Sequence, residues 1–392
     1  MNVILDLCIR TTEPIPISYP AATTNTPHIR HTSSSLTLLA RRLPPSDNIP
    51  HNMATTIRKA LIPSFGDASH IEIVDAQIEP PAANHVQIKT IYAGMGGADF
   101  LMREGTYPQQ RSAPLTPGYN LIGRVHKNGP GSSKFQVGDM VACLTKYDAD
   151  AELCNCPEKY LVPVPEGIDL KQAVTLVLDW ATAYGMVYRT AQVSKGQKVF
   201  IHGLSGSVGY ALLTLCKLEG AEVYGTAHPS KLDQLRKDGV TPFSYKDKNW
   251  IQTMIGMGGV EAAFDALGYE SWDESWQIIN PKGGRLVGYG GNQNTLNGES
   301  GNRGQLPSIA KLLARGANPF CPKHTSFFYI DRDQKTYGPE LQKCFDLLVS
   351  GKIQVPIKKV WTLEQIPEAH RERNNLPGIG SVVVKINDDL EA

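Results

Sequence analysis

The sequence predicts an α/β protein in which a doubly wound parallel sheet accompanies a β-rich domain. Two observations lead to this prediction. Short apolar runs separated by Gly and Pro fill residues 57–167, and strands then alternate with helices toward the C-terminus. Closely spaced short strands are typical of a small barrel-like domain, whereas strand–helix alternation builds a parallel sheet covered on both faces. The 392 residues are enough for two such domains.

The first domain is expected to consist mainly of strands. Apolar and polar residues alternate in a series of runs, which occupy residues 57–65, 70–78, 85–94, 118–129, 137–145 and 158–167. The hydrophobic period then becomes helical over residues 171–191. This change of period marks the point at which the β-rich region gives way to the α/β region.

Strands and helices alternate from residue 198 onward. Strands are predicted at 198–203, 221–227, 261–267 and 283–290, and helices at 207–220, 230–239 and 269–280. The segment near 295–320 is interpreted as a loop plus a helix. Both are expected to lie over a cofactor cleft. The chain ends with helices at 338–351 and 363–373, a strand between them, and a final strand at 380–386.

Residues 1–52 differ in character from those that follow. They are rich in Ser, Thr, Pro and Arg and lack a sustained period, so they cannot bury enough apolar surface to offset the entropy of ordering. They are interpreted as a disordered N-terminal extension, a mitochondrial transit peptide, or an upstream extension of the reading frame before Met53. A folded domain begins directly after Met53, which favours the first and third interpretations. We therefore expect a cytoplasmic protein, with a mitochondrial location as the alternative.

Composition excludes several classes of function. The 39 Lys and Arg nearly cancel the 38 Asp and Glu, so no strong field attracts nucleic acid or an anionic membrane. No run approaches the roughly eighteen apolar residues of a membrane span. The 7 Cys are scattered, which predicts free thiols in a reducing compartment. The one close pair, Cys154 and Cys156, suits a tetrahedral zinc poorly because a single residue separates its members. A small molecule is the expected partner.

A glycine-rich turn between a strand and a helix is the strongest chemical signal. Gly lets the backbone turn sharply and approach a pyrophosphate, and a helix N-terminus offers unpaired N–H groups and a positive dipole end. The spacing is G-x-x-G-x-x-G, so the strand–turn–helix context supports the prediction more than the glycines alone; a purely structural turn is the alternative. The predicted nucleotide contacts in this turn are Gly203, Ser205, Gly206, Ser207, Val208 and Gly209.

The end of the next strand favours NADPH over NADH. NAD sites usually place Asp or Glu there to bind the ribose hydroxyl, whereas NADP sites use cationic or hydroxyl groups for the 2′-phosphate. No carboxylate stands at this strand end, where the candidate phosphate contacts are Thr226, His228, Ser230 and Lys231. Tyr245 follows the next strand and is expected to cover the adenosine. The alternative for Lys231 is a solvated position on a helix.

Several segments occur in the order found in medium-chain dehydrogenase/reductases. They are AGMGGADFLMREGTYP, TPGYNLIGRV, FQVGDMVA, LDWATAYG, FIHGLSGSVG, GTAHPSKLDQLRKDGVT, GVEAAFDALG, GGRLVGYGG and LLVSGKIQVPI. Over roughly residues 56–386 the chain resembles the zinc-independent, zeta-crystallin-like quinone oxidoreductase group of that superfamily, and within it the vesicle amine transport protein branch most closely.

The resemblance implies a Rossmann domain inserted into a GroES-like catalytic domain, with the cofactor in the cleft between them. It assigns residues 53–171 to the first part of the GroES-like domain, 172–330 to the Rossmann NADP-binding domain and 331–392 to completion of the catalytic domain. A homodimer built through the edge of the Rossmann sheet is also implied. Leu267, Gly288 and Gly290, which follow or end later strands, complete the expected cofactor contacts.

The resemblance also implies a site without catalytic zinc. Zinc-dependent relatives carry a Cys, a Gly-His-Glu segment and a second Cys. Here residues 93–97 contain no thiol, Tyr119 and Asn120 replace His and Glu, and Asp179 and Trp180 stand near the position of the last ligand. Without these ligands no Lewis acid polarises a simple ketone, so alcohol dehydrogenase activity is not expected.

A zinc-free site can still pass a hydride to an electron-poor acceptor, such as a quinone or an α,β-unsaturated carbonyl, whose product charge is delocalised. On the resemblance, Tyr107 and Tyr119 are candidate hydrogen-bond donors and Thr182 lies against the nicotinamide; packing roles are the alternative for both tyrosines. Gly96 stands where quinone reductases usually have Asn, and Asn120 also departs from their pattern. Two other functions therefore stay open: a trans-acting enoyl reductase of a polyketide or other secondary-metabolite pathway, and a non-catalytic NADPH-binding protein.

Overall fold

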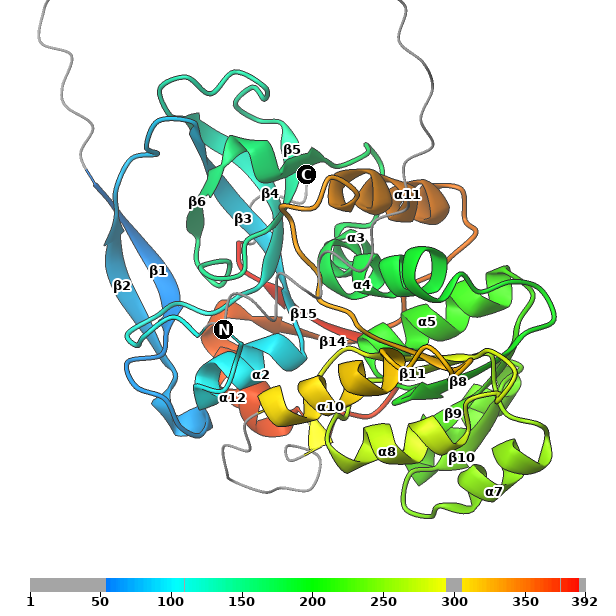
Figure 1. The fold of residues 1–392 in the computed structure, drawn as a ribbon. Coiled ribbons are helices and arrows are strands. Elements are labelled where there is room, and N and C mark those ends of the chain that lie inside the picture. Colours follow the sequence, from blue (N-terminus) through cyan, green and yellow to red (C-terminus); the bar gives the residue numbers. More distant parts are fainter. Residues whose placement is uncertain (1–53, 109, 294–304, 374, 388–392) are drawn as a thin grey trace, which may run out of the picture. The chain divides into compact units, whose positions relative to one another are not determined.

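Figure 1 shows a computed structural model of the protein, which describes residues 54–108, 110–293, 305–373 and 375–387. The described residues contain a six-stranded parallel sheet and a seven-stranded, mainly antiparallel sheet, and a separate ribbon of β1 (Thr55–Leu61) and β2 (Glu72–Ile78). The two sheets confirm the predicted combination of a doubly wound domain with a β-rich domain. Residues 1–52 lie outside the described ranges, so their interpretation stays a prediction.

The strand order of the parallel sheet places a ligand site at its centre. In spatial order the strands are β10 (Thr241–Ser244), β9 (Glu222–Ala227), β8 (Lys198–His202), β11 (Ala262–Asp265), β12 (Arg285–Gly288) and β13 (His324–Phe327). The chain winds outward from β8 in one direction and from β11 in the other. In open parallel sheets, ligands bind at the carboxyl ends of the strands where this reversal occurs.

Strand alternation sends the side chains of β8 into two different cores. Phe200 packs on one face against Trp250 of α7 (Asn249–Gly256), in a cluster that also contains Trp272 of α8 (Glu270–Gln277). Val199 and Ile201 lie in the cluster on the other face. That second cluster also contains residues of α5 (Ser207–Leu218) and α11 (Tyr337–Val349). Both faces of the strand are therefore dry, as expected for a parallel sheet.

Helix α10 (Leu306–Gly316) corrects one prediction. We expected the helix within residues 295–320 to lie over the cofactor cleft. Instead its Ile309 and Leu312 pack in the same cluster as Trp272, on the face of the parallel sheet. The helix joins the neighbouring parallel strands β12 and β13, and such a crossover packs on the sheet. Residues 294–304, where the expected loop falls, lie outside the described residues.

The seven-stranded sheet joins strands from both ends of the chain. Its centre is β3 (His85–Met95), which pairs with β4 (Asn120–Asn128), β6 (Leu153–Pro157) and β15 (Ser381–Lys385). The remaining strands are β5 (Met140–Leu144), β7 (Leu161–Pro163) and β14 (Ile357–Thr362). Strand β6 was not predicted. The short helices of this region are α2 (Gly97–Glu104), α12 (Ile366–Glu372), η1 (Ala68–His70), η2 (Glu158–Tyr160) and η6 (Leu363–Gln365).

The predicted helical stretch 171–191 contains two π-helical segments. It comprises α3 (Leu170–Thr175), η3 (Leu176–Trp180), α4 (Ala181–Tyr184) and η4 (Gly185–Ala191), of which η3 and η4 are π-helical. Isolated π-helical turns are rare and often occur at functional sites. This stretch packs against α5. None of the helices in the described ranges has the length and apolar character that crossing a bilayer requires.

Candidate functional site

The glycine-rich turn lies at the carboxyl end of β8 and leads into α5. Gly203 has φ +76° and, among the described residues, no atom lies within 4 Å of the Cβ that another residue would carry there. Gly206 precedes the helix in an extended conformation, so the first N–H groups of α5 face out of the helix. Gly209 serves packing, because a Cβ there would overlap the Gly203 carbonyl oxygen. An open turn with free N–H groups fits a pyrophosphate.

The other predicted residues of the turn border this opening. Ser205, Ser207 and Val208 are all partly exposed. The Ser205 carbonyl oxygen accepts a hydrogen bond from the Gly380 N–H at 3.1 Å. Gly380 directly precedes β15, so the turn is in contact with the segment that enters the seven-stranded sheet.

Three of the predicted phosphate and adenosine contacts lie together at the end of β9. The His228 Nδ1 is 2.9 Å from the Ser230 hydroxyl, and the His228 and Tyr245 rings are 5.9 Å apart. All three side chains are exposed. The Thr226 hydroxyl does not join them, because it lies 3.1 Å from the Nδ1 of buried His202. The Thr226 carbonyl oxygen accepts hydrogen bonds from the N–H groups of Gly203 and Leu204, so Thr226 holds the glycine turn in place.

The Lys231 side chain reaches across to the C-terminal segment. Its Nζ lies 3.5 Å from the Leu376 carbonyl oxygen, in a partly buried position. Burial and the neighbouring charge of Lys231 both lower the pKa of Lys358, a residue of β14. The charges of Lys231 and Lys358 therefore act on one another, and two cations that interact in this way suit an anionic ligand.

The predicted residues on later strands take two different positions. Leu267 follows β11, and its N–H donates to the Asp265 carboxylate at 2.8 Å. A Cβ at Gly290 would lie 2.6 Å from the Ala266 carbonyl oxygen, so the turns after β11 and β12 approach closely. Gly288 ends β12, where a Cβ would press on the side chains of Trp272 and Leu312. The missing side chain of Gly288 therefore serves packing.

A buried polar network under the strand ends was not predicted. The Asp265 carboxylate accepts hydrogen bonds from the hydroxyls of Ser271 and Ser275, each at 2.7 Å. His202 lies between Ser275, 3.0 Å away, and Thr226. Burial lowers the pKa of His202, so the ring is neutral. The network joins the ends of β8, β9 and β11, and its burial makes Ser275 a structural hydroxyl rather than a nucleophile.

The two predicted catalytic tyrosines are in contact with a third that the sequence did not indicate. The Tyr107 hydroxyl donates to the Tyr119 hydroxyl at 2.6 Å and lies 3.3 Å from the hydroxyl of Tyr329. We call these three residues the tyrosine cluster. Burial raises the pKa of Tyr107 and of Tyr119 well above the ordinary value, so both phenols stay protonated. Neutral buried phenols are hydrogen-bond donors to a ligand oxygen.

Three acidic side chains are linked through Asp99, whose charge acts on both Asp150 and Asp179. The Asp99 carboxylate accepts a hydrogen bond from the Gly96 N–H at 2.8 Å, and burial raises its pKa to about 6. Burial and the charge of Asp99 raise the pKa of Asp150 well above its usual range. Asp179, on η3, is partly exposed and contacts the Ser207 hydroxyl. Burial is the main cause that raises the pKa of Asp179 to about 7.

Asn120 and Thr182 are both largely enclosed. The Asn120 amide donates to the Val174 carbonyl at 2.7 Å, and a Cβ at Gly94 would lie 2.7 Å from that amide. Asn120 thus ties β4 to α3 and Gly94 leaves room for it, so this departure from the family pattern serves packing. Thr182 lies in α4, between the two π-helical segments, and is 8% exposed.

The thiols of β6 form a buried group with Cys143. Cys154 and Cys156 point to the same side of the strand, with their Sγ atoms 3.6 Å apart. Hydrogen bonds with the neighbouring thiols, together with burial, raise the pKa of Cys156 well above its ordinary value. Protonated buried thiols are poor metal ligands and nucleophiles. Within the described ranges, no group of three or more His, Cys, Asp or Glu is arranged to hold a metal ion.

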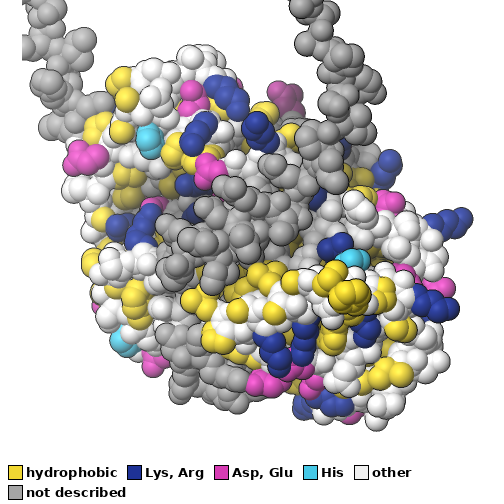
Figure 2. All heavy atoms as spheres, viewed as in Figure 1, with side chains coloured by type: hydrophobic (Ala, Val, Ile, Leu, Met, Phe, Trp, Pro, Cys, Tyr) yellow, Lys and Arg dark blue, Asp and Glu magenta, His cyan; other side chains and the backbone are white. Residues whose placement is uncertain are grey.

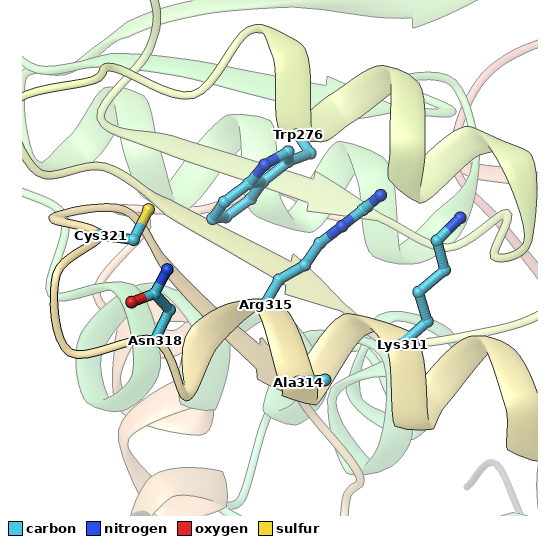
Figure 3. Close-up of a pocket in the computed structure, with 6 residues that line it drawn as sticks. All are labelled: Trp276, Lys311, Ala314, Arg315, Asn318 and Cys321. Atoms are coloured by element: carbon cyan, nitrogen blue, oxygen red, sulfur yellow. The ribbon is translucent and has the colours of Figure 1, made fainter.

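A separate hollow of 470 Å³ lies on the outer surface of the parallel-sheet domain (Figure 3). Its lining comes from the end of α8, from α10 and from the segment before β13: Trp276, Lys311, Ala314, Arg315, Asn318 and Cys321. These segments lie toward the amino ends of the strands, whereas the glycine turn lies at the carboxyl ends. On the face drawn in Figure 2, the acidic and basic side chains of the described residues are interspersed.

Comparisons with known proteins agree with this architecture. Residues 82–167 match the alcohol dehydrogenase GroES-like domain, and residues 239–384 match the zinc-binding dehydrogenase family. The synaptic vesicle membrane protein VAT-1 homolog of Rattus norvegicus is 27% identical over 84% of this chain and 84% of its own length. A probable quinone oxidoreductase of Schizosaccharomyces pombe is 27% identical over 83% of this chain and 96% of its own.

Solved structures show the same fold. The human VAT-1 homolog-like protein superposes with a TM-score of 0.70 at 22% identity, covering 85% of this chain and 99% of the other. The JamJ enoyl reductase superposes with a TM-score of 0.73 at 22% identity, covering 85% of this chain and 100% of the other. At these identities the likeness concerns the fold alone.

Proposed function

The chain belongs to the medium-chain dehydrogenase/reductase superfamily, and on that premise we propose that it is a zinc-independent reductase that transfers a hydride from NADPH to a quinone or an α,β-unsaturated carbonyl compound. Membership of the superfamily and the likeness to quinone oxidoreductases make the chain an oxidoreductase with a nicotinamide cofactor. The cofactor form and the acceptor class are the proposed part.

The tyrosine cluster is the observation that carries the proposal. When bound, NADPH supplies the hydride. Reduction of a quinone or an enone places negative charge on a carbonyl oxygen, and that oxygen needs a donor in a site without zinc. Tyr107 and Tyr119 are both neutral, and because the Tyr107 hydroxyl already donates to Tyr119, the Tyr119 hydroxyl is the donor available to that oxygen, in a buried setting where a hydrogen bond to a developing charge is stronger than in water. Tyr329 contacts the Tyr107 hydroxyl and so helps to fix its direction.

The cofactor half of the proposal is supported by the glycine turn and by the residues beyond β9. Gly203 and Gly206 leave the N-terminus of α5 open to a pyrophosphate. His228 and Ser230 offer exposed polar groups near the expected 2′-phosphate, and Lys231 adds a cation. No carboxylate that would favour the ribose hydroxyl of NADH stands at this strand end.

The proposal is tested by following NADPH consumption with a panel of quinones, enones and enoyl thioesters. We expect turnover with quinones or enones, and slower turnover in Tyr119→Phe with an unchanged Kd for NADPH. Turnover confined to enoyl thioesters would instead indicate a biosynthetic enoyl reductase. Tight NADPH binding without reduction of any acceptor would contradict the proposal and indicate a cofactor-binding protein.

We also propose that two copies pair through β13 and that the protein acts in the cytoplasm. Within the described sheet β13 is hydrogen-bonded to β12 alone, which leaves its outer edge available for a second copy. Light scattering of the purified protein should give the mass of a dimer, and Phe327→Pro on this edge should shift it toward the monomer.

A further inference from the structure

We propose that Asp179 is a cofactor-binding residue that must carry a proton when NADPH or NADH binds, so that cofactor binding takes up a proton from solution. This inference rests on the proposed function, because it concerns the cofactor of that site. It goes beyond that function by giving one carboxyl group a role in binding that depends on its protonation.

Asp179 occupies the space between the glycine turn and the β-rich domain. It lies in the π-helical segment η3, and its side chain is hydrogen-bonded to Ser207, the first residue of α5. A Cβ added at Gly96 would lie 3.8 Å from the Asp179 Oδ1, with no other described atom beyond the adjoining residues within 4 Å. The carboxyl group therefore borders an open space beside the predicted pyrophosphate position, which a side chain at position 96 would otherwise enter.

Charged groups from several elements face this carboxyl. Asp99 of α2 repels its negative form, whereas Lys358 of β14 attracts it. The neighbour of Lys358 is Lys231, from the Rossmann side. Tyr289, which follows β12, is partly buried and feels the Asp179 charge as well. Desolvation outweighs Lys358 and the Ser207 hydrogen bond, so the pKa of Asp179 is about 7 and the group is about half protonated near neutral pH.

A bound pyrophosphate would change this balance in one direction. It carries negative charge to the N-terminus of α5, where Ser207 already contacts Asp179. A neighbouring like charge disfavours the ionised carboxylate and raises its pKa further. The protonated carboxyl can instead donate to a phosphate oxygen, which is a strong, charge-assisted hydrogen bond. Asp179 is therefore protonated when the cofactor is bound and partly ionised when the site is empty.

The sign and size of the pH dependence follow from proton linkage. At about pH 6 Asp179 is already protonated, and cofactor affinity is near its maximum. As the pH rises through about 7, the free protein must regain a proton in order to bind, and the Kd rises up to about tenfold per pH unit. If the pKa in the complex is about 8 or higher, the Kd rises about five- to tenfold between pH 6 and pH 8.

The experiment titrates NADH and NADPH against the full chain between about pH 6 and pH 8.5 by fluorescence quenching. NADH is included because the 2′-phosphate of NADPH itself titrates near pH 6. Calorimetry in two buffers with different heats of ionisation measures proton uptake directly. In the wild-type protein, we expect uptake of about half a proton or more near pH 7.5, and the stated rise in Kd.

Two variants separate Asp179 from its neighbours. Asp179→Asn should bind both cofactors at pH 8 about as tightly as the wild type does at pH 6, with no proton uptake. A gain of affinity at pH 8 cannot result from misfolding. Lys358→Arg keeps a positive charge that does not titrate, so the pH dependence should persist in it.

Several results would overturn the inference. They are a Kd that does not change between pH 6 and pH 8, a pH dependence that survives in Asp179→Asn, and a dependence abolished by Lys358→Arg. A dependence abolished by Lys358→Arg would assign the titration to Lys358, whereas one that survives in Asp179→Asn would assign it to another group, such as Lys358 or Asp99. Binding of cofactor without any turnover would refute the proposed function alone, whereas pH-independent binding with turnover would refute this inference alone. Failure of both cofactors to bind at any pH would refute both.

Discussion

Asp179 should destabilise the cofactor-free protein at neutral and alkaline pH, and Asp179→Asn should relieve this. The pKa of Asp179 is raised in the folded protein from 3.8 to about 7. Below about pH 4 both folded and unfolded chains hold the proton, and the group has no effect on stability. As the pH rises from about 4 to 7 the unfolded chain ionises first, so the wild type loses stability until Asp179 ionises in the folded state as well.

The size of the loss follows from the shift. A shift of roughly three pKa units, at about 1.4 kcal/mol per unit, lowers the free energy of unfolding by at most about 4 kcal/mol. The side chain is partly exposed, and solvent screening reduces this to about 2 kcal/mol. For a domain of this size that corresponds to a rise in Tm of about 4 °C for Asp179→Asn at pH 8.

Thermal unfolding of wild type and variant at pH 5 and pH 8, without cofactor, measures this difference. Relative to the wild type, the Tm of the variant should rise much more at pH 8 than at pH 5. Asp75→Asn, on the exposed face of β2, is the matched control and should show no such dependence. An equal effect of Asp179→Asn at both pH values, or destabilisation at pH 8, would refute the reasoning.

Other perturbations address the cofactor, the chemistry and the metal. Lys231→Ala should weaken NADPH binding about tenfold, because one charge-assisted contact is lost, and should leave NADH binding nearly unchanged in fluorescence titrations. An equal loss of affinity for both cofactors would refute a role of Lys231 at the 2′-phosphate. Tyr119→Phe should slow hydride transfer about 10- to 100-fold in single-turnover kinetics, and an unchanged rate would assign Tyr119 to packing. Elemental analysis should find no stoichiometric zinc, and about one zinc per chain with chelator-sensitive activity would contradict a zinc-independent site.

The fold could be predicted from the sequence where local pattern and tertiary role coincide. The run from β8 through the glycine turn to α5 combines a buried apolar strand, the glycines and an apolar helix face, so both type and order were recognisable. Strand β6 was missed, since its five residues hold too little alternation to stand out. Helix α10 was recognised as a helix but misplaced, because an apolar stripe does not reveal which surface it covers.

The candidate site was harder to predict for a related reason. Tyr107 and Tyr329 are 222 residues apart, and no local pattern connects them. The buried polar network at the strand ends could have been suspected from the sequence, although only weakly. His202 and Asp265 each end an otherwise apolar run, which is the one local pattern that they share. Asp179 likewise interrupts an apolar helical stretch, but the π-helical turn that places it beside Ser207 is set by packing rather than by residue type.

Hydride transfer itself is tested most directly by isotope transfer. The protein is mixed with NADPH that carries deuterium at the transferable position of the nicotinamide, together with an α,β-unsaturated ketone, and the product is examined by mass spectrometry. If the protein transfers the hydride, we expect one deuterium on carbon in the saturated ketone, with consumption of an equal amount of NADPH. Consumption of NADPH without deuterium in the product, or a bound cofactor that stays reduced with every acceptor, would contradict it.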